Sequence, residues 1–276
     1  MTPSRPALRY YGGKWRIAPW ILSHFPKHVC YVEPFGGGAS VLLQKEPSRI
    51  EVYNDLDGEV VAFFRVLRER PQDLIRAIKL TPYSREEYKA AWEPATDELE
   101  RARRLYVRSR QGRGGCTREA FTGWRFQRTD NRGKSLTGDW LTVAHLEDAC
   151  KRFLEVQIEN DDALKVIERY DTPQTLFYVD PPYVTDTRYE TARREYRHEM
   201  SDDDHRALAA GLQKIKGMVI VSGYPSELYQ ELYAGWRRVE MVTHTDSATA
   251  ATECLWLSPS ADARASSLRL PIGGVQ

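Results

Sequence analysis

The chain has 276 residues, of which 41% are hydrophobic and 29% are charged, and its formal net charge is +1. This length accommodates one large α/β domain with an inserted segment, and the composition is that of an ordinary globular protein. The chain has no run of about 18 apolar residues, and its first residues lack the apolar core of a signal peptide. We therefore expect a cytoplasmic protein without a membrane partner.

The four cysteines lie at positions 30, 116, 150 and 254, without a Cys-x-x-Cys pair. This spacing argues against a zinc ribbon and against a disulfide framework. His24 and His28 are four residues apart, but Pro26 interrupts any helix that would join them, and no nearby acid completes a metal site. The sequence thus predicts reduced thiols and no bound metal.

The first motif in chain order is a glycine turn, Arg9-Tyr-Tyr-Gly-Gly-Lys-Trp15, which presents Lys14 between aromatic residues. A lysine at such a turn is a point charge for a carboxylate or a phosphate. The elements expected next are a helix near Ile17–Phe25, a strand over Cys30–Glu33, the loop Pro34–Ser40 and a helix from about Val41. Three glycines in the loop allow a ligand to lie against the turn and the helix N-terminus.

The next expected strand, Arg49–Tyr53, ends at Asn54-Asp-Leu-Asp57. Asp55 lies 17 residues after Gly38, close to the spacing at which an acid after the second strand binds ribose hydroxyls. The strict G-x-G-x-x-G pattern is absent. The sequence therefore indicates an adenosine-containing cofactor but not the pyrophosphate of a nicotinamide dinucleotide.

After a helix expected from about Asp57 to Arg68, the strand pattern disappears until about Leu154. The interval is predicted to hold helices over 71–79, 84–92, 97–110 and 141–153, and the glycine-rich stretch 111–139 is too long to be a passive connection. We interpret 69–153 as a helical insert that divides an α/β domain into residues 1–68 and 154–259, with a flexible tail over 260–276.

The insert carries a basic block between Arg101 and Ser135. This block contains eleven Lys or Arg residues and only two acids, Glu119 and Asp130, so that its local charge is +9. Aromatic residues and glycines are interleaved with these cations, a pattern typical of a surface that contacts phosphates and stacks on bases. Alternatively, the arginines pair with acids of the α/β domain and the charge is structural. The residues predicted to bind DNA are Arg108, Arg110, Arg113, Arg118, Trp124, Arg125 and Arg128.

Strands resume after the insert and alternate with helices. The expected elements are the strand Glu155–Ile158, the helix Ala163–Tyr170, the strand Leu176–Val179, the capped helix His205–Lys216, the strand Met218–Ser222, the helix Glu227–Leu232 and a hairpin of Arg237–Thr243 with Cys254–Leu257. This alternation predicts an α/β fold, a Rossmann-like sheet with helices on both faces, plus the helical insert.

The strand Leu176–Val179 stops at Asp180-Pro-Pro-Tyr183. Ligands of open α/β sheets bind at the carboxyl ends of the strands. There, the Asp180 carboxylate and the Pro181 carbonyl can accept the two N–H bonds of an exocyclic amine while Tyr183 stacks on its ring. Taken alone, the tetrapeptide favours an ordinary turn over a site, and only the motifs upstream reverse this preference.

The chain resembles the Dam-like DNA adenine-N6 methyltransferases over about Ala7–Pro259, through motifs in that family's order: Tyr10-Tyr-Gly-Gly-Lys14, Glu33-Pro-Phe-Gly-Gly-Gly38, Asn54-Asp55, the basic insert, Asp180-Pro-Pro-Tyr183 and Thr252-Glu-Cys-Leu-Trp-Leu257. The resemblance implies methyl transfer from S-adenosylmethionine to adenine N6 in double-stranded DNA, with the base flipped out. It implies catalytic roles for Asp180, Pro181 and Tyr183. It implies cofactor contacts from Tyr10, Lys14, Glu33, Phe35, Gly36, Gly38, Asp55, Asp162 and Asp180.

Asp162 is the least secure of these residues, because Asp161 stands beside it and a helix cap is the plainer role for either. Three alternatives stay open: methylation of cytosine N4, methylation of structured RNA, and a DNA-binding module with a vestigial cofactor site. The intact Lys14, glycine loop, Asp55 and Asp180 argue against the last. We expect the chain to act as a monomer.

Overall fold

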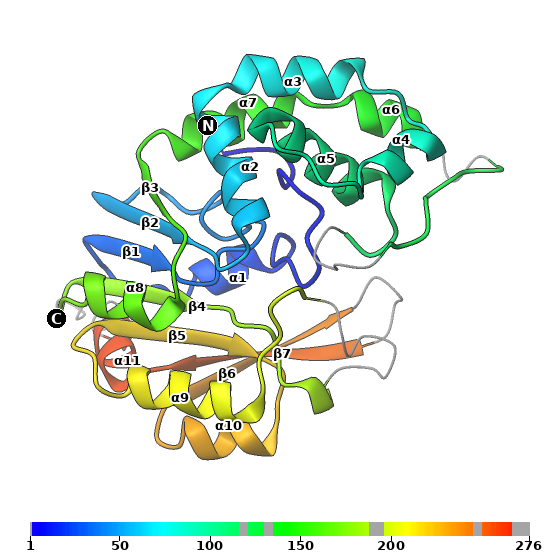
Figure 1. Ribbon diagram of the computed structural model, residues 1–276. Helices are drawn as coiled ribbons and strands as arrows, with labels where there is room; N and C mark the ends of the chain where they lie inside the picture. The colour runs from blue at the N-terminus through cyan, green and yellow to red at the C-terminus, as the bar shows by residue number, and fades with distance from the viewer. Residues whose placement is uncertain (1, 116–120, 130–134, 188–195, 245–249, 267–276) are drawn as a thin grey trace, which may run out of the picture.

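The computed structural model describes residues 2–115, 121–129, 135–187, 196–244 and 250–266. Within these residues a seven-stranded sheet has the order β3-β2-β1-β4-β5-β7-β6 (Figure 1). The first five strands in this order are parallel, and β7 runs antiparallel to both β5 and β6. The strands are β1 (Cys30–Glu33), β2 (Ile50–Asn54), β3 (Val156–Glu159), β4 (Thr175–Val179), β5 (Met218–Gly223), β6 (Arg237–His244) and β7 (Ala250–Leu257).

Helices cover both faces of the sheet, which confirms the predicted α/β class (Figure 1). Successive side chains of a strand point to opposite faces, so that in β4 Leu176 and Tyr178 enter one hydrophobic core while Phe177 and Val179 enter the other. The first core is covered by α1 (Ala18–Leu22), α2 (Gly58–Glu69) and α11 (Pro259–Ser266), and the second by α8 (Ala163–Tyr170), α9 (Asp202–Leu212) and α10 (Glu227–Leu232).

The described helices between α2 and β3 form an upper layer in Figure 1: α3 (Pro71–Leu80), α4 (Arg85–Ala90), α5 (Glu98–Gln111), α6 (Leu136–Leu141) and α7 (Ala144–Phe153). They pack on α2 through stacked rings, with centroids 4.4 Å apart for Phe64 and Phe153 and 6.4 Å apart for Phe63 and Tyr106. Their buried side chains continue the first core of the sheet. Whether residues 69–153 form a domain of their own stays a prediction.

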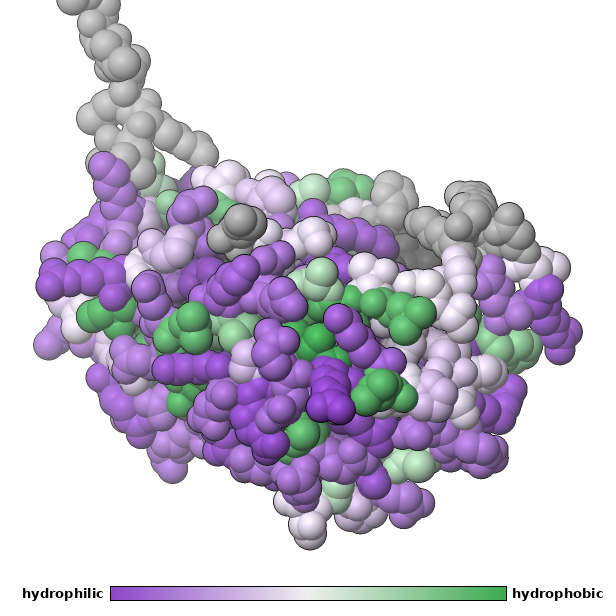
Figure 2. Space-filling view, turned by 90° about the horizontal axis from the view of Figure 1, so that it is seen from above, coloured by the Kyte–Doolittle hydropathy of each residue, from purple (hydrophilic) through white to green (hydrophobic). Residues whose placement is uncertain are grey.

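Local sequence signals explain where several helices begin. Pro71 stands at the start of α3, where its missing N–H costs nothing. Ser201 and Asp204 form a reciprocal capping box at α9, and the Asp97 side chain accepts from the backbone of Glu100 at α5. None of the described helices is long and apolar enough to span a membrane. Hydrophilic side chains cover most of the face seen in Figure 2, with hydrophobic ones among them.

Three sequence-based boundaries are corrected. The helix expected from Val41 is instead a run of turns, in which Leu43 N–H still bonds to the Ala39 carbonyl at 3.0 Å, because Pro47 soon follows and disfavours a helix before it. The helix expected over 141–153 divides into α6 and α7, separated at Thr142 and Val143. Helix α11 extends to Ser266, past the expected start of the tail at 260, and residues 267–276 lie outside the described part.

Candidate active site

A cleft opens at the carboxyl ends of β1, β2 and β4, where the strand order reverses between β1 and β4. This is the place at which doubly wound sheets bind their ligands. All of the predicted cofactor residues except Asp162 line its larger hollow, namely Tyr10, Lys14, Glu33, Phe35, Gly36, Gly38, Asp55 and Asp180. A smaller hollow adjoins it and shares Tyr10, Phe35, Asp55 and Tyr196.

The carboxylate of Asp180 is anchored through one of its two oxygens. Lys14 Nζ lies 3.0 Å from Oδ1, and the Ser222 hydroxyl donates to the same atom at 2.6 Å. Lys14 is itself held in place, because it also donates to the Gly12 carbonyl at 2.7 Å and is only 6% exposed. Ser222 stands on β5, beside β4 in the sheet. The anchoring orients Asp180, whose side chain is 18% exposed, at the floor of the cleft.

Tyr183 is buried behind Asp180, and neither it nor Pro181 belongs to the walls of the two hollows. Lys14 Nζ sits 4.5 Å from the centroid of the Tyr183 ring. The Tyr183 hydroxyl donates to Glu253 Oε2 at 2.8 Å, and burial raises its pKa well above the ordinary value for a phenol. The hydroxyl is therefore a permanent donor at neutral pH.

Asp55 ties the glycine loop to the end of β2. Its Oδ2 accepts from Gly37 N–H at 2.7 Å and its Oδ1 from Asp57 N–H at 2.8 Å. Burial raises the pKa of the Asp55 carboxyl to about 6, although these two backbone bonds act in the opposite direction. The group is thus ionised at neutral pH and able to accept further hydrogen bonds.

Glu33 closes the inner wall of the cleft at the end of β1 and is 2% exposed. The Tyr31 hydroxyl donates to its Oε1 at 2.6 Å. Burial raises the pKa of Glu33 to about 8, and the neighbouring Asp180 carboxylate acts in the same direction. The Glu33 carboxyl is therefore largely neutral at pH 7.

The glycine loop brings two tyrosine rings against its backbone. A Cβ at Gly36 would lie 2.2 Å from Tyr53 Cε2, and one at Gly37 would lie 2.8 Å from Tyr10 Cε1. Gly37 also has a φ of +46°, in the left-handed region that favours glycine. These glycines are thus required by packing inside the protein as well as by the cleft that they line.

The sequence predicts that the polar segment Thr185–Met200 is mobile and lies over the cleft, and its residues Tyr196–His198 do line the cleft. Tyr196 lines both hollows, and its hydroxyl donates to the Tyr11 carbonyl at 3.4 Å. Arg197 forms an ion pair of 3.0 Å with Asp57, the N-cap residue of α2. The polar composition of the segment indicated its place, but not the individual partners, because these lie more than a hundred positions away in the chain.

Asp162 is the N-cap of α8, where its side chain accepts from the backbone of Leu164 and Lys165 at 3.0 and 3.2 Å. Its carboxylate is therefore engaged by the helix, and it lines neither hollow. The predicted cofactor contact of Asp162 stays a prediction, which this placement does not support. Ala163 lines the smaller hollow in its place.

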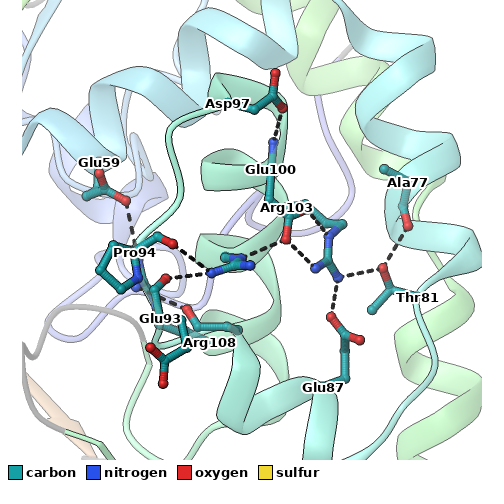
Figure 3. A network of polar contacts seen from close by, with 12 residues as sticks. Glu59, Ala77, Thr81, Glu87, Glu93, Pro94, Asp97, Glu100, Arg103 and Arg108 are labelled. Carbon is teal, nitrogen blue, oxygen red and sulfur yellow. Dashed lines mark hydrogen bonds and ion pairs between the residues drawn. The ribbon is translucent and has the colours of Figure 1, made fainter.

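In the inner half of the basic block, Arg101–Arg110, most arginines form ion pairs with acids of the protein itself. Arg103 forms ion pairs of 2.6 Å with both Glu87 and Glu100, in the network shown in Figure 3. Arg108, whose side chain is 11% exposed, lies 3.5 Å from Glu59 of α2 and over the ring of Trp92. The local charge is thus partly balanced by acids that precede the block in the sequence.

Arg110 lies in the interior, 6% exposed. It donates to the Pro6 carbonyl at 2.6 Å, contacts His145 at 3.1 Å and lies over the Tyr106 ring. A guanidinium held in this way is not available to a phosphate. The contacts of Arg110, and those of the paired Arg108, are those of structural residues, and their predicted DNA contacts stay predictions that this placement does not support.

In the outer half of the block, Arg113 and Arg128 are exposed and Arg125 is half-buried. Backbone bonds of 2.9 Å from Arg113 to Gly123 and 2.8 Å from Arg125 to Gln111 join the segments 111–113 and 123–125 into a short ribbon. Trp124 stacks on Phe126, Arg85 covers both rings, and Arg128 covers Phe126 from an exposed position. Arg118, also predicted to bind DNA, lies outside the described residues.

Two residues of the site went unassigned in the sequence. Ser222 ends an expected strand, and a polar residue at a strand's carboxyl end is a signal that was available. Glu253 is an acid within the apolar run of β7, 8% exposed. An acid in such a run indicates a buried partner, which the structure identifies as Tyr183.

Comparison with known proteins identifies the family of the chain. The family model described as D12 class N6 adenine-specific DNA methyltransferase matches residues 10–246. The chain is 24% identical to a DNA adenine methylase of Escherichia coli (strain K12) over 250 residues, covering 84% of this chain and 85% of that protein. It is 24% identical to a DNA adenine methylase of Salmonella typhi over 244 residues, with 84% and 85% covered.

A further relative is the Type II methyltransferase M1.LlaDCHI of Lactococcus lactis subsp. cremoris, 26% identical over 248 residues, with 83% of this chain and 84% of that protein covered. The family match includes the cleft, Asp180 and the whole basic block. The chain therefore belongs to the D12 class N6 adenine-specific DNA methyltransferases.

Proposed function

We propose that this methyltransferase transfers a methyl group from S-adenosylmethionine to adenine N6 in double-stranded DNA, after the base has been flipped out of the duplex. The observation that carries the proposal is the carboxylate of Asp180, anchored through Oδ1 in a cleft that Asp55 also lines. This arrangement supports a role for one acid towards an amine and for the other towards a ribose.

The cleft fits the proposed cofactor. Tyr10 and Phe35 provide ring surfaces for an adenosine, and the ionised Asp55 provides acceptors for ribose hydroxyls. Gly36 and Gly38 allow the cofactor to approach the backbone, and Lys14 and Glu33 complete the polar lining. When bound, S-adenosylmethionine supplies a methyl group activated by the positive charge on its sulfur.

The amine of adenine is a weak nucleophile, because its lone pair is delocalised into the ring. Acceptors on the amine hydrogens localise that pair, and their effect grows as charge develops in the transition state. Both contacts described for Asp180 engage Oδ1, which leaves Oδ2 to accept one N–H. From the family resemblance we assign the second acceptor to the Pro181 carbonyl and a ring against the extruded base to Tyr183, although neither residue lines the two hollows of this structure.

The DNA surface that we propose is the ribbon with the exposed Arg113 and Arg128 and the half-buried Trp124 and Arg125, together with Arg118. The ribbon adjoins the cleft, because a Cβ at Gly115 would lie 2.8 Å from the Arg9 carbonyl, next to the turn that carries Lys14. A duplex held by cations at the ribbon therefore lies beside the methyl-transfer site. Binding of this kind depends steeply on salt.

The test is incubation of unmethylated duplex DNA with the protein and S-adenosylmethionine, followed by sequencing that maps N6-methyladenine. Asp180→Ala should lower the rate on the order of 100-fold or more, because one transition-state acceptor is lost. Asp203→Ala, at an exposed position in the first turn of α9, is the matched control and should leave the rate unchanged.

Three results would contradict the proposal. They are near-normal turnover by a folded, cofactor-binding Asp180→Ala protein, methylation of cytosine in place of adenine, and modification of structured RNA but not of duplex DNA. A protein that binds DNA without any transfer would indicate a vestigial cofactor site.

A further inference from the structure

A continuous series of contacts runs from strand β7 to the proposed catalytic acid. Glu253 Oε2 accepts from the Tyr183 hydroxyl at 2.8 Å, and the Tyr183 ring lies 4.5 Å from Lys14 Nζ. Lys14 Nζ in turn lies 3.0 Å from Asp180 Oδ1. Glu253 is thus two side chains removed from Asp180, and it lines neither hollow of the cleft.

The three members of this series behind Asp180 are buried. Glu253 and Tyr183 are both 8% exposed and Lys14 is 6% exposed. A buried carboxylate is costly unless it is hydrogen-bonded, and the same holds for a buried phenol. The bond between Tyr183 and Glu253 therefore satisfies both groups at once, and it restricts rotation of the Tyr183 side chain.

The fold holds Glu253 rigidly. In the ladder next to it Cys254 pairs with Gly223 of β5 on one side and with Glu240 of β6 on the other. The ring of Tyr183 is also contacted edge-on by Tyr224, with centroids 4.8 Å apart. Lys14 therefore meets a ring whose position is set from two sides, and a shift of that ring would displace the cation that anchors Asp180.

We propose that Glu253 is a positioning residue for methyl transfer. Its carboxylate fixes the Tyr183 hydroxyl, and the fixed Tyr183 ring keeps the Lys14 ammonium in position against the Asp180 carboxylate. This inference rests on the proposed function, since it concerns the geometry of the same reaction. It assigns no contact with cofactor or DNA to Glu253. We assign its effect to the Tyr183 hydroxyl; the charge of Lys14 also acts on Glu253, where it opposes the rise in pKa that burial causes.

A double-mutant cycle tests this dependence. Four proteins are compared: wild type, Tyr183→Phe, Glu253→Leu and the double variant. Each single change should lower kcat on the mapped duplex about tenfold or more, as expected for loss of a hydrogen bond to a charged group. The double variant should be no slower than the slower single variant, because both changes break the same bond. Glu253→Gln, which keeps an acceptor oxygen, should restore most of the activity.

Glu240→Leu is the matched control, because Glu240 faces Cys254 across the ladder and its side chain is 51% exposed. It should leave kcat unchanged. Urea unfolding of every variant separates a change of position from a loss of fold. If Glu253→Leu does not fold, Glu253→Ala removes the same acceptor without adding bulk and takes its place in the cycle.

Two outcomes would overturn the inference while leaving the proposed function intact. One is a double variant whose defect is the product of the two single defects, and the other is a folded Glu253→Leu protein with wild-type kcat. Absence of methylation by the wild type would instead refute the proposed function itself.

Discussion

Substitution of the buried Glu33 by glutamine should stabilise the protein at neutral pH. Glu33 is 2% exposed, and burial raises the pKa of its carboxyl to about 8 from the ordinary 4.5. Glutamine has nearly the same shape as the neutral acid and still offers an acceptor oxygen for a neighbouring N–H, while its amide can donate to the Tyr31 hydroxyl oxygen. The substitution therefore removes only the penalty for ionising a buried carboxyl.

The sign and size of the effect follow from linkage between protonation and folding. Because the folded pKa is raised, the unfolded chain loses its proton first, and the contribution of Glu33 to stability is fully present below pH 4.5 and is lost as the pH rises toward 8. At about 1.4 kcal/mol per pH unit, the advantage of Glu33→Gln should be small at pH 5, about 3 kcal/mol at pH 7 and up to about 5 kcal/mol at pH 8.

The assay is urea unfolding of wild type and variant at several pH values from 5 to 8. Glu51→Gln is the matched control on β2, since Glu51 is equally buried. Burial alone would raise its pKa, but hydrogen bonds and charge from Arg152 and Lys45 outweigh burial and lower it. Glu51→Gln should therefore destabilise by a nearly constant amount over this range. A Glu33→Gln advantage that does not grow with pH would refute the reasoning.

Three further predictions concern the cleft and the DNA surface. The affinity for S-adenosylmethionine should fall as the pH drops through about 6, because burial raises the pKa of Asp55 to that value. Calorimetry should show that Asp55→Asn binds the cofactor weakly and without this pH dependence. If the variant keeps the wild-type dependence of affinity on pH, the ribose contact is rejected. Gly12→Ala should weaken cofactor binding, because Gly12 has a φ of +69° and a Cβ there would lie 2.2 Å from the Tyr196 hydroxyl; unchanged affinity would show that Tyr196 moves aside freely. Replacing the exposed Arg113 and Arg128 by glutamine should reduce the slope of DNA affinity against salt by about 0.9 for each lost phosphate contact, and an unchanged slope would remove both from the DNA surface.

Local patterns in the sequence were enough for the sheet and for the order of the motifs. The stretches at Cys30–Glu33 and Thr175–Val179 are short, apolar and bounded by polar turns, and both are strands close to the predicted limits. Asp55 directly follows β2, and Asp180 directly follows β4. Because the carboxyl ends of parallel strands meet at one edge, these two acids could be expected in one cleft before any contact was known.

Only the tertiary structure distinguishes, among residues of the same chemical type, those that are buried in structural contacts from those that are exposed to a ligand. Arg110 and Arg113 are three positions apart in the same basic block, yet the first is buried against Pro6 and the second is exposed on the ribbon. Residue type cannot distinguish them, since the difference lies in partners about a hundred residues away in the chain.

The same holds for the acids of the site. Asp162 caps its own helix, while Glu253, in an apolar strand without a local signal for function, supports Tyr183 across the sheet. Spacing and composition predict the local structure of a segment, such as a helix and the residue that caps it. The burial that raises the pKa of Glu33, and the pairing that joins Lys14 to Asp180, depend on segments that only folding brings together.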